Sequence, residues 1–500
     1  MKPLVLCVLD GYGMREESHG NAIKLANTPN FDYLWNRYPH SLLEAGGTCV
    51  GLPSGAMGGS EVGHLNMGAG RIIYQPLELI NQEIASGEIK QNKTLLDAID
   101  HVKKNNSKFH CFGMSSDKGV HSDINHLFAI LDILKEHNVT NVYLHLCTDG
   151  RDSDVTSGID YVKRIEEKLS SLGIGKIATI GGRYYAMDRD RNWDRIKIGY
   201  DAIVNGIGEQ FNTAKEALLT SYQNNITDEF IKPCIIDPAG IIEDGDTFFN
   251  FNFRKDRELQ IMAALTDPTF AQFETIKFQN LYVTSIMFYS KTIKASYCYK
   301  IGVLENTLGE YIAKHGKTQL RIAETEKYQY VTSVFDGLRE IEIPGKKEIL
   351  IPSPNVATFD LAPEMSVYEV TDAVVKEIAS SEHDFILLNY ANPDMVGHTG
   401  NLNAAVLAVE AVDKCLGKVY QTVKEQKGIL IITADHGNAD LMLCDKNKPV
   451  TAHSLSKVPF IICNENYSVK DGILTEIGPT ILKIMGLPIP EGYLQTTLLK

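Results

Sequence analysis

The segment Gly428–Asp440 reads GILIITADHGNAD and decides how we interpret the rest of the chain. Its apolar, β-branched run Ile429–Ile432 is typical of a strand that is buried on both faces of a parallel sheet. Asp435 and His436 follow at the carboxyl end of that strand, where open α/β sheets bind their ligands. A carboxylate oxygen and an imidazole nitrogen are suitable ligands for Mn²⁺ or Zn²⁺. The structural alternative is a strand-end turn with a capping aspartate and an exposed histidine.

The amino-terminal segment repeats this pattern. The apolar run Leu4–Leu9 is followed directly by Asp10 and Gly11. An ordinary Asp-Gly turn after a strand would read the same way. If both strands lie parallel in one sheet, their carboxyl ends share an edge, and that edge carries two carboxylates.

A glycine-rich stretch, Gly51–Arg71, contains a candidate nucleophile. Ser60 precedes residues that are typical of the first turns of a helix. As an isolated serine it would be the N-cap of that helix. The same position suits phosphate chemistry, because a helix N-terminus favours anions and a nearby divalent metal would activate the hydroxyl.

The composition narrows the functional class. The chain has 500 residues, of which 44% are hydrophobic and 22% charged, and its net charge is −14. This acidity argues against a broad nucleic-acid or anionic membrane surface, although a small anionic substrate fits if basic residues cluster locally. Nine cysteines without a CxxC pair indicate a reducing compartment. No apolar run approaches the ~20 residues of a membrane helix. We therefore expect a folded, cytoplasmic, monomeric protein.

The middle of the chain places polar residues after successive predicted strands. These strands are Phe109–Ser115, Val142–Cys147, Ile177–Ile180 and Phe248–Phe253. A single arginine is ordinarily a solvated surface charge. Several at strand ends predict a clamp for a small, doubly charged anion, because guanidinium groups bind phosphate and carboxylate in a bidentate manner. The residues concerned are His121, Arg151, Asp152, Arg183, Arg189, Arg254 and Arg257.

Further candidate ligands lie in the carboxyl-terminal half. Asp394 and His398 follow the predicted strand Phe385–Asn389 and are four residues apart, so one helical turn would place them on the same face. A capping aspartate and a surface histidine are the alternative. His453 precedes another strand and would by itself be structural. Lys327 becomes functional only if it returns to the same edge, where it could neutralise a transferring phosphoryl group.

The candidate ligands come from both ends of the chain, which predicts an insertion. We expect a doubly wound α/β domain made of residues 1–75 and 305–500, with a second α/β domain, residues 76–304, inserted into it. The expected linkers lie near Arg71–Leu77 and Cys298–Gly309. The mixed oxygen and nitrogen ligands suit two metal ions, which phosphoryl-transfer sites hold ~3.5–4 Å apart. The candidate ligands are Asp10, Ser60, Asp394, His398, Asp435, His436 and His453.

Ten motifs along nearly the whole chain resemble those of one family, in the same order. They are DGYG, GGSEVGHLNMGAGR, SDKGVHSDINHL, TDGRD, GRYYAMDRD, FNFRKDR, AETEKY, NYANPDMVGHTG, ADHGNAD and TAHS. The chain resembles the 2,3-bisphosphoglycerate-independent phosphoglycerate mutases of the alkaline phosphatase superfamily. The resemblance implies interconversion of 3-phosphoglycerate and 2-phosphoglycerate in glycolysis and gluconeogenesis, through a phosphoserine and with two Mn²⁺ ions.

The resemblance also assigns roles by position. It implies that Ser60 is the nucleophile, that Asp152 is the acid or base for the substrate hydroxyls, and that Lys327 stabilises the transferring group. One metal would take Asp10, Ser60, Asp435 and His436, and the other Asp394, His398 and His453. The positions that match substrate-binding residues of the family are His121, Arg151, Asp152, Arg183, Arg189, Arg254, Arg257 and Lys327.

Three details depart from the family pattern. Gly59 stands where the family more often has asparagine, Lys255 stands where proline is usual, and Ser285–Thr292 replaces a more typical stretch. None of these removes a matched ligand. Two other functions remain possible on the sequence. One is a phosphopentomutase or plain phosphomonoesterase with the same metals, and the other is a non-catalytic protein that binds metal and phosphate.

Overall fold

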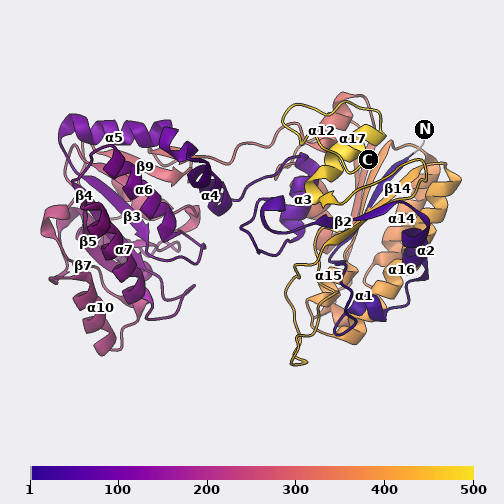
Figure 1. Ribbon diagram of the computed structural model, residues 1–500, viewed down its shortest axis with the longest axis horizontal. Coiled ribbons are helices and arrows are strands. Elements are labelled where there is room, and N and C mark those ends of the chain that lie inside the picture. The colour runs from indigo at the N-terminus through magenta and orange to yellow at the C-terminus, as the bar shows by residue number, and fades with distance from the viewer. Residues whose placement is uncertain (1–2) are drawn as a thin grey trace. The chain divides into compact units, whose positions relative to one another are not determined.

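The computed structural model describes residues 3–500 and divides into two compact units (Figure 1). Unit 1 comprises Met1–Gln75 and Val303–Lys500, and unit 2 comprises Pro76–Gly302. Unit 2 therefore lies between the two segments of unit 1 in the chain. Each unit is built on its own eight-stranded sheet.

The sheet of unit 1 is parallel at its centre and mixed toward one edge. Its order is β12-β11-β13-β1-β14-β15-β2-β16. Neighbours from β12 to β14 run parallel, whereas β15 runs antiparallel to both of its neighbours. The strands are β1 (Leu4–Leu9), β2 (His40–Glu44), β11 (Gln319–Glu324), β12 (Lys346–Ile351), β13 (Phe385–Tyr390), β14 (Ile429–Thr433), β15 (Val458–Ile462) and β16 (Gly472–Ile473).

The register of the central strands brings the candidate residues together. β1 lies between β13 and β14, and Leu9 pairs with Tyr390 while Val8 pairs with Thr433. All six residues of β1 and of β13 are buried, as continuous apolar runs require when helices cover both faces of a sheet. The three strands therefore end at nearly the same level, and the residues that follow them share one edge.

Helices pack on both sides of this sheet. Helices α14 and α16 contact each other and cover one side, while α3 contacts α12 and α17 (Figure 1). The long α16 buries an apolar stripe that includes Ala404, Ala408 and Val412, as expected for an amphipathic helix. The helices are α1 (Ala22–Leu25), α2 (Pro29–Arg37), α3 (Ser60–Ala69), α12 (Leu308–Lys314), α13 (Thr325–Gln329), α14 (Val367–Ser380), α15 (Asn392–Gly397), α16 (Leu402–Glu425) and α17 (Ile477–Ile484).

The sheet of unit 2 has the order β10-β9-β8-β3-β4-β5-β7-β6. Every pair in it is parallel except β5 with β7. Its strands are β3 (Phe109–Met114), β4 (Val142–Thr148), β5 (Lys176–Gly182), β6 (Glu209–Gln210), β7 (Cys234–Ile235), β8 (Thr247–Asn250), β9 (Tyr282–Met287) and β10 (Ser296–Tyr299). Its helices are α4 (Pro76–Ser86), α5 (Lys93–Asn105), α6 (Ile124–Glu136), α7 (Gly158–Leu172), α8 (Arg183–Ala186), α9 (Trp193–Tyr200), α10 (Ala214–Gln223) and α11 (Leu259–Thr266).

The predicted α/β class is confirmed, and one local prediction is wrong. The strand expected over Phe248–Phe253 ends at Asn250, because Asn250 accepts a hydrogen bond from the Asn252 amide (3.0 Å) and both side chains turn inward to Glu258. Pro76 is the first residue of both unit 2 and α4. Proline is well tolerated there because the first helical N–H has no intrahelical partner.

No helix among the described residues combines the length and the apolar character needed to cross a membrane. The hydrophobic residues instead form two large interior clusters, one in each unit. The core of unit 1 is centred on β1, β13 and β14, the strands that carry the candidate residues.

Packing at this centre should dominate the stability of unit 1. Leu387 in β13 has an exposed fraction of 0%, so Leu387→Ala leaves a cavity and should cost about 2–5 kcal/mol of unfolding free energy. Leu407 on α16 is 53% exposed, and Leu407→Ala is the matched control, with an expected change below about 0.5 kcal/mol. Urea unfolding followed by circular dichroism measures both. Equal effects would show that β13 is not at the centre of the core.

Candidate active site

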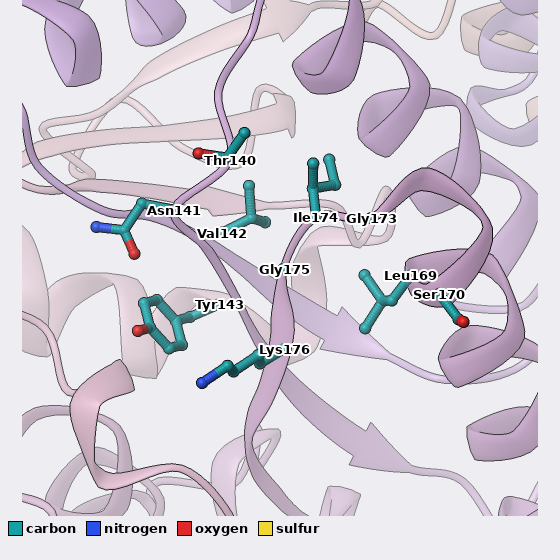
Figure 2. A pocket seen from close by; sticks show the side chains of 10 residues that line it. All are labelled: Thr140, Asn141, Val142, Tyr143, Leu169, Ser170, Gly173, Ile174, Gly175 and Lys176. Atoms are coloured by element: carbon teal, nitrogen blue, oxygen red, sulfur yellow. The ribbon is translucent and has the colours of Figure 1, made fainter.

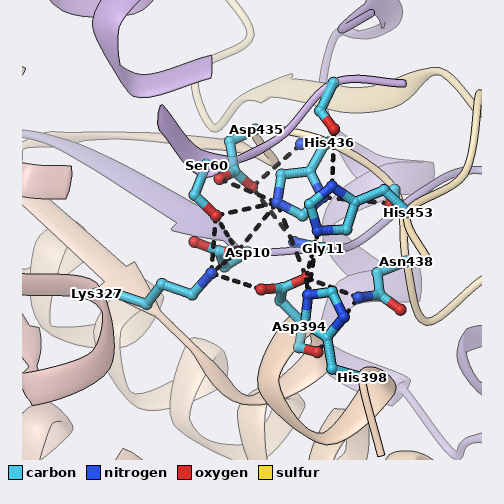
Figure 3. A network of polar contacts seen from close by, with 12 residues as sticks. Asp10, Gly11, Ser60, Lys327, Asp394, His398, Asp435, His436, Asn438 and His453 are labelled. Carbon is cyan, nitrogen blue, oxygen red and sulfur yellow. Dashed lines mark hydrogen bonds and ion pairs between the residues drawn. The ribbon is translucent and has the colours of Figure 1, made fainter. Parts of the chain in front are cut away.

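Three carboxylates meet at the carboxyl edge of the unit 1 sheet. Asp10 follows β1, Asp435 follows β14, and Asp394 lies in the first turn of α15, directly after β13. All three are buried, with exposed fractions of 2% or less. Figure 3 shows them around one polar network, to which α3 contributes Ser60 and α13 contributes Lys327. The sequence expectation that these strand ends converge is met by the geometry.

Ser60 points its hydroxyl into this network. Its Oγ donates to Asp10 Oδ1 (3.2 Å) and lies 3.1 Å from His436 Nε2. The alternative that Ser60 is merely an N-cap is wrong, because Gly59 is the N-cap of α3 and Ser60 is the first helical residue. Its side chain is therefore free of any capping role and sits at the positive end of a helix.

Lys327 binds the same atoms from the other side. Its Nζ donates to Ser60 Oγ (2.7 Å), Asp10 Oδ1 (2.8 Å) and Asp394 Oδ2 (2.5 Å). Burial opposes the ammonium charge, but the carboxylates of Asp10 and Asp394 raise the pKa of Lys327 above its ordinary value. The lysine is therefore a fixed cation within hydrogen-bonding distance of the candidate nucleophile.

Two histidines add ligand atoms next to Asp394. The Nδ1 atoms of His398 and His453 each bond to a backbone carbonyl, those of Thr451 and Gly58, both at 2.7 Å. These bonds fix the proton on Nδ1 and leave a lone pair on each Nε2. The two Nε2 atoms are 3.1 Å apart, and they lie 3.2 Å and 3.4 Å from Asp394 Oδ1. The two imidazole lone pairs and the carboxylate oxygen all accept hydrogen bonds and face one another, so a proton or a metal cation must lie between them.

His436 links this group to the other two carboxylates. Its Nε2 is 3.4 Å from Asp10 Oδ1, 3.6 Å from Asp435 Oδ2 and 3.9 Å from Asp394 Oδ1. Burial would lower the pKa of His436, but Asp435 and Asp394 raise it to about 10. Asp435 Oδ2 is buried without a hydrogen-bond partner. These residues fit a divalent metal, since oxygen and imidazole donors converge and an acceptor is left unpaired.

The distances group the ligands differently from the assignment that the resemblance implied. Atoms of Asp394, His436 and His453 lie within 4.8 Å of one another, and so do atoms of Asp10, His64 and Asp435. His436 was expected with the second group and lies between both. Ser60 and His398 are within the same network (Figure 3). All seven predicted ligands therefore occupy one site, and their division between ions stays a prediction.

Sequence reasoning missed three residues that hold the ligands in place. His64 Nδ1 donates to the backbone oxygen of Ser60 (2.9 Å) and lies 3.3 Å from Asp435 Oδ2. Asn389 Nδ2 donates to Asp10 Oδ2 (2.8 Å), and Asn438 Nδ2 donates to Asp394 Oδ1 (2.7 Å). A signal existed for His64, which lies one helical turn after Ser60.

Unit 2 contains a second polar site, centred on Arg183. This arginine is buried between Asp149 and Asp152, to which Nη1 donates at 2.6 Å and 2.5 Å. Its Nη2 donates to His121 Nε2 (2.8 Å). Burial and the neighbouring Arg183 charge lower the pKa of His121 to about 4, so the ring is neutral and its proton lies on Nδ1. Asp149 was not predicted, and it orients the guanidinium.

The remaining predicted arginines differ in their surroundings. Arg189 and Arg254 each form an ion pair with Asp256, at 3.0 Å. Asp256 was not predicted as a site residue. Arg257 is mostly buried and donates to the backbone oxygen of Met187 (2.9 Å). Arg151 is exposed; its Nε lies 3.7 Å from Glu229, and its backbone N–H donates to Asp149 Oδ1 (3.3 Å).

Several buried polar atoms of this second site lack hydrogen-bond partners. They are Arg183 Nε, Arg257 Nε and His121 Nδ1. Buried polar groups are normally paired, so three unpaired donors in one region indicate a place for a polar ligand. Burial would raise the pKa of Asp152, but its bond with Arg183 lowers it below the ordinary value, so Asp152 is a carboxylate.

A separate hollow in unit 2 is not lined by the residues of this polar site. Figure 2 shows a cavity of about 390 Å³ lined by residues such as Asn141, Tyr143, Leu169 and Lys176. It lies where β4 and β5 begin, whereas His121 and Arg183 follow the opposite ends of β3 and β5. Lys176 is the one charged residue of its lining and pairs with Asp237 (3.0 Å). The hollow therefore lacks the features of an anion site.

Two family models match the chain. The model described as BPG-independent PGAM N-terminus, where BPG denotes 2,3-bisphosphoglycerate, matches residues 80–291. The model described as type I phosphodiesterase / nucleotide pyrophosphatase matches residues 275–462. The first match falls almost entirely in unit 2, and most of the second falls in the long segment of unit 1.

Among solved structures, a phosphoglycerate mutase from Leishmania mexicana, solved at low cobalt concentration, is 31% identical. The match covers 100% of this chain and 98% of that chain, with a TM-score of 0.59. The PH0037 protein from Pyrococcus horikoshii is 11% identical over 98% of both chains, with a TM-score of 0.37. Alkaline phosphatase from the Antarctic bacterium TAB5 is 10% identical over 97% of this chain and 98% of that chain, with a TM-score of 0.29. These last two TM-scores are too low to indicate a function.

The fold, the first structural match and the family models define an enzyme of the alkaline phosphatase superfamily with an inserted α/β unit. The chain belongs to the BPG-independent phosphoglycerate mutases. The resemblance and the enzyme class predicted from the sequence are confirmed. Membership of this family favours a phosphoglycerate mutase over the phosphopentomutase, phosphatase and non-catalytic alternatives.

One buried acid beside Arg257 makes the stability of unit 2 depend on pH. Glu258 accepts hydrogen bonds from Asn250 Nδ2 (2.7 Å) and Asn252 Nδ2 (2.8 Å) and has an exposed fraction of 0%. Burial raises the pKa of Glu258 from 4.5 to about 7 despite these bonds. The folded state therefore holds a proton that the unfolded chain has already lost near pH 6.

This linkage has a definite sign. As pH rises from 5 to 8, the unfolding free energy of the wild type should fall by about 2 kcal/mol relative to Glu258→Gln, because the unfolded chain ionises first. Urea titrations at each pH give the difference, and Glu209→Gln, at an exposed glutamate of unit 2, is the control. A constant difference between wild type and Glu258→Gln across this range would show that Glu258 is not buried as a neutral acid.

Proposed function

We propose that the protein interconverts 3-phosphoglycerate and 2-phosphoglycerate through a phosphoserine at Ser60, as a step of glycolysis and gluconeogenesis. The observation that carries the proposal is the surroundings of Ser60 Oγ. A fixed cation, Lys327, donates to it at 2.7 Å, and it bonds to Asp10 at a helix N-terminus. A hydroxyl in this setting can attack phosphorus and the resulting phosphate is stabilised by positive charge.

The proposed reaction uses Ser60 as a temporary phosphoryl carrier. Ser60 Oγ attacks the phosphorus, the bond from phosphorus to the glycerate oxygen breaks, and the phosphoryl group then returns to the other hydroxyl. The Lys327 ammonium donates hydrogen bonds to the transferring oxygens and keeps its proton, because its carboxylate neighbours raise its pKa. Positive charge at this point stabilises the transition state more than the ground state.

Asp152 suits the proton transfer that the exchange of hydroxyls requires. One hydroxyl gains a proton when phosphorus leaves it, and the other loses one when phosphorus arrives. In the first transfer, the glycerate oxygen that becomes free gains the proton that Ser60 Oγ loses. In the second transfer, the Asp152 carboxylate takes the proton of the attacking glycerate hydroxyl, and Ser60 Oγ regains a proton as the phosphoryl group leaves it. The bond with Arg183 keeps Asp152 in that form and fixes its position.

The basic residues of unit 2 are proposed to bind the glycerate and its phosphate. Guanidinium groups bind carboxylate and phosphate in a bidentate manner, and the unpaired Nε atoms of Arg183 and Arg257 are available for this. The proposed substrate-binding residues are His121, Arg151, Asp152, Arg183, Arg189, Arg254, Arg257 and Lys327.

Two Mn²⁺ ions are proposed as cofactors, and the donor set described above fits divalent metal. When bound, such ions supply Lewis acidity, which lowers the pKa of a serine hydroxyl and neutralises phosphoryl oxygens. The residues that would hold them are Asp10, Ser60, Asp435 and His436 for one ion and Asp394, His398 and His453 for the other. The identity and number of the ions, the cytoplasmic location and the monomeric state remain predictions.

The test follows the fate of the phosphoryl group. The purified protein is stripped with EDTA and given 3-phosphoglycerate without bisphosphoglycerate, with and without Mn²⁺. We expect Mn²⁺-dependent formation of 2-phosphoglycerate with little free phosphate. Ser60→Ala should lower this rate at least about a thousandfold, since no nucleophile remains.

The outcomes separate the alternatives. Free phosphate without 2-phosphoglycerate would indicate a phosphatase and contradict the mutase reaction. Full activity of Ser60→Ala would contradict the phosphoserine. Full activity after EDTA treatment, with metal analysis showing none bound, would contradict the need for Mn²⁺. Glu326→Gln, at an exposed residue next to Lys327, is the control for handling and folding.

A further inference from the structure

The connection between β12 and α14 forms a closed loop whose two ends meet. It runs from Pro352 to Ser366, and Ser366 Oγ donates to the backbone oxygen of Pro352 (2.7 Å). We call this segment the brace loop. Compact surface loops with adjoining ends are self-contained units, and their ends are the points at which they are anchored. Two separate elements of the active site hold the brace loop, one at its ends and one along its length.

The ends of the brace loop are held by the residues that begin α13, the helix of Lys327. Glu324 is buried, with an exposed fraction of 1%, and accepts a hydrogen bond from Ser353 Oγ (2.8 Å). Thr325 Oγ1 accepts from the backbone N–H of Ser353 (3.1 Å). Glu324 and Thr325 therefore both bond to Ser353 at the first end of the loop, which Ser366 joins to the second end.

The body of the brace loop is held by α15, the helix of Asp394. Asn392 is fully buried, and its Nδ2 donates to the backbone oxygens of Pro363 (3.1 Å) and Glu364 (2.8 Å). The short 3₁₀ turn Phe359–Leu361 packs on α15 and α16. The loop is thus bonded on one side to the helix of Lys327 and on the other to the helix of Asp394.

These anchors matter because α13 is a short helix with a demanding task. It has five residues, Thr325–Gln329, and continues into a π-helical turn, Tyr330–Val334. So short a helix has little stability of its own. Its Lys327 must nevertheless keep Nζ within 2.7 Å of Ser60 Oγ and 2.5 Å of Asp394 Oδ2. The spacing between Lys327 and Asp394 must be set by something outside α13.

We propose that the brace loop sets this spacing, and that Glu324 and Asn392 are positioning residues for phosphoryl transfer that act through it. The inference rests on the role proposed above for Lys327. Glu324 touches neither substrate nor the reacting atoms. It fixes the start of α13 to the loop, while Asn392 fixes the loop to α15. Misplacement of a catalytic group by about 1 Å can cost two orders of magnitude in rate.

The first test uses an isosteric change at Glu324. Glu324→Gln keeps the size of the side chain but replaces one of the two acceptor oxygens with an amide. We expect kcat to fall about tenfold with KM within about twofold, because the substrate-binding arginines are unaffected. Amide hydrogen exchange in residues 354–364 should become faster in the same variant. Glu326→Gln makes the same substitution at an exposed position on α13 and is the matched control.

The second test asks whether the two anchors act through the same loop. Glu324 and Asn392 share no hydrogen bond with each other, so independent effects would multiply in the double variant. Transmission through the brace loop predicts instead that Glu324→Gln combined with Asn392→Ala is at most about threefold slower than the slower single variant. Asn392→Leu, which keeps the size of the side chain but removes both Nδ2 bonds, replaces Asn392→Ala if that variant does not fold.

Three outcomes would overturn the inference. Glu324→Gln could match Glu326→Gln in kcat and in hydrogen exchange, the two effects could multiply, or KM could rise while kcat stays constant. Lys327→Ala separates this failure from failure of the proposed function. If Lys327→Ala is inactive while Glu324→Gln is normal, only the brace is contradicted. If Lys327→Ala is fully active, the role of the lysine fails, and the brace fails with it.

Discussion

Three buried carboxylates at one sheet edge, Asp10, Asp394 and Asp435, are the constraint on which the structure of unit 1 depends. Buried like charges repel, and burial itself disfavours ionisation, so the site needs positive charge to exist in this form. Lys327 and His436 supply part of it, and their raised pKa values are the consequence. The carboxylates make the site suitable for metal ions, and the positive charge beside them makes it suitable for a phosphoryl group in transfer.

The two units solve opposite electrostatic problems. Unit 1 contains a cluster of carboxylates, which cations stabilise, whereas unit 2 contains a cluster of guanidinium groups. Asp149, Asp152 and Asp256 pair with these guanidinium groups but leave some of the guanidinium nitrogens unpaired. The local cluster of guanidinium groups gives an acidic chain, of net charge −14, a region that suits a small anion.

Much of the fold and site could be predicted because buried parallel strands are apolar runs with ligands at their ends. The strands that precede Asp10, Asp394 and Asp435 were all found this way, since period and position are local properties. Asn389 and Asn438, which hold Asp10 and Asp394 in place, were not predicted, because these contacts join elements far apart in the chain. The end of β8 was missed for a different reason, since an apolar run does not reveal that Asn250 turns toward Glu258.

The central claim is that Ser60 carries the phosphoryl group between the two glycerate oxygens. The most direct measurement is mass spectrometry of the peptide that contains Ser60, after the Mn²⁺-loaded enzyme has been mixed with 3-phosphoglycerate and quenched in acid within milliseconds to seconds. The account predicts one phosphoryl group on Ser60, formed and lost at rates compatible with turnover. Turnover to 2-phosphoglycerate without any phosphorylated Ser60 at the shortest times would contradict it.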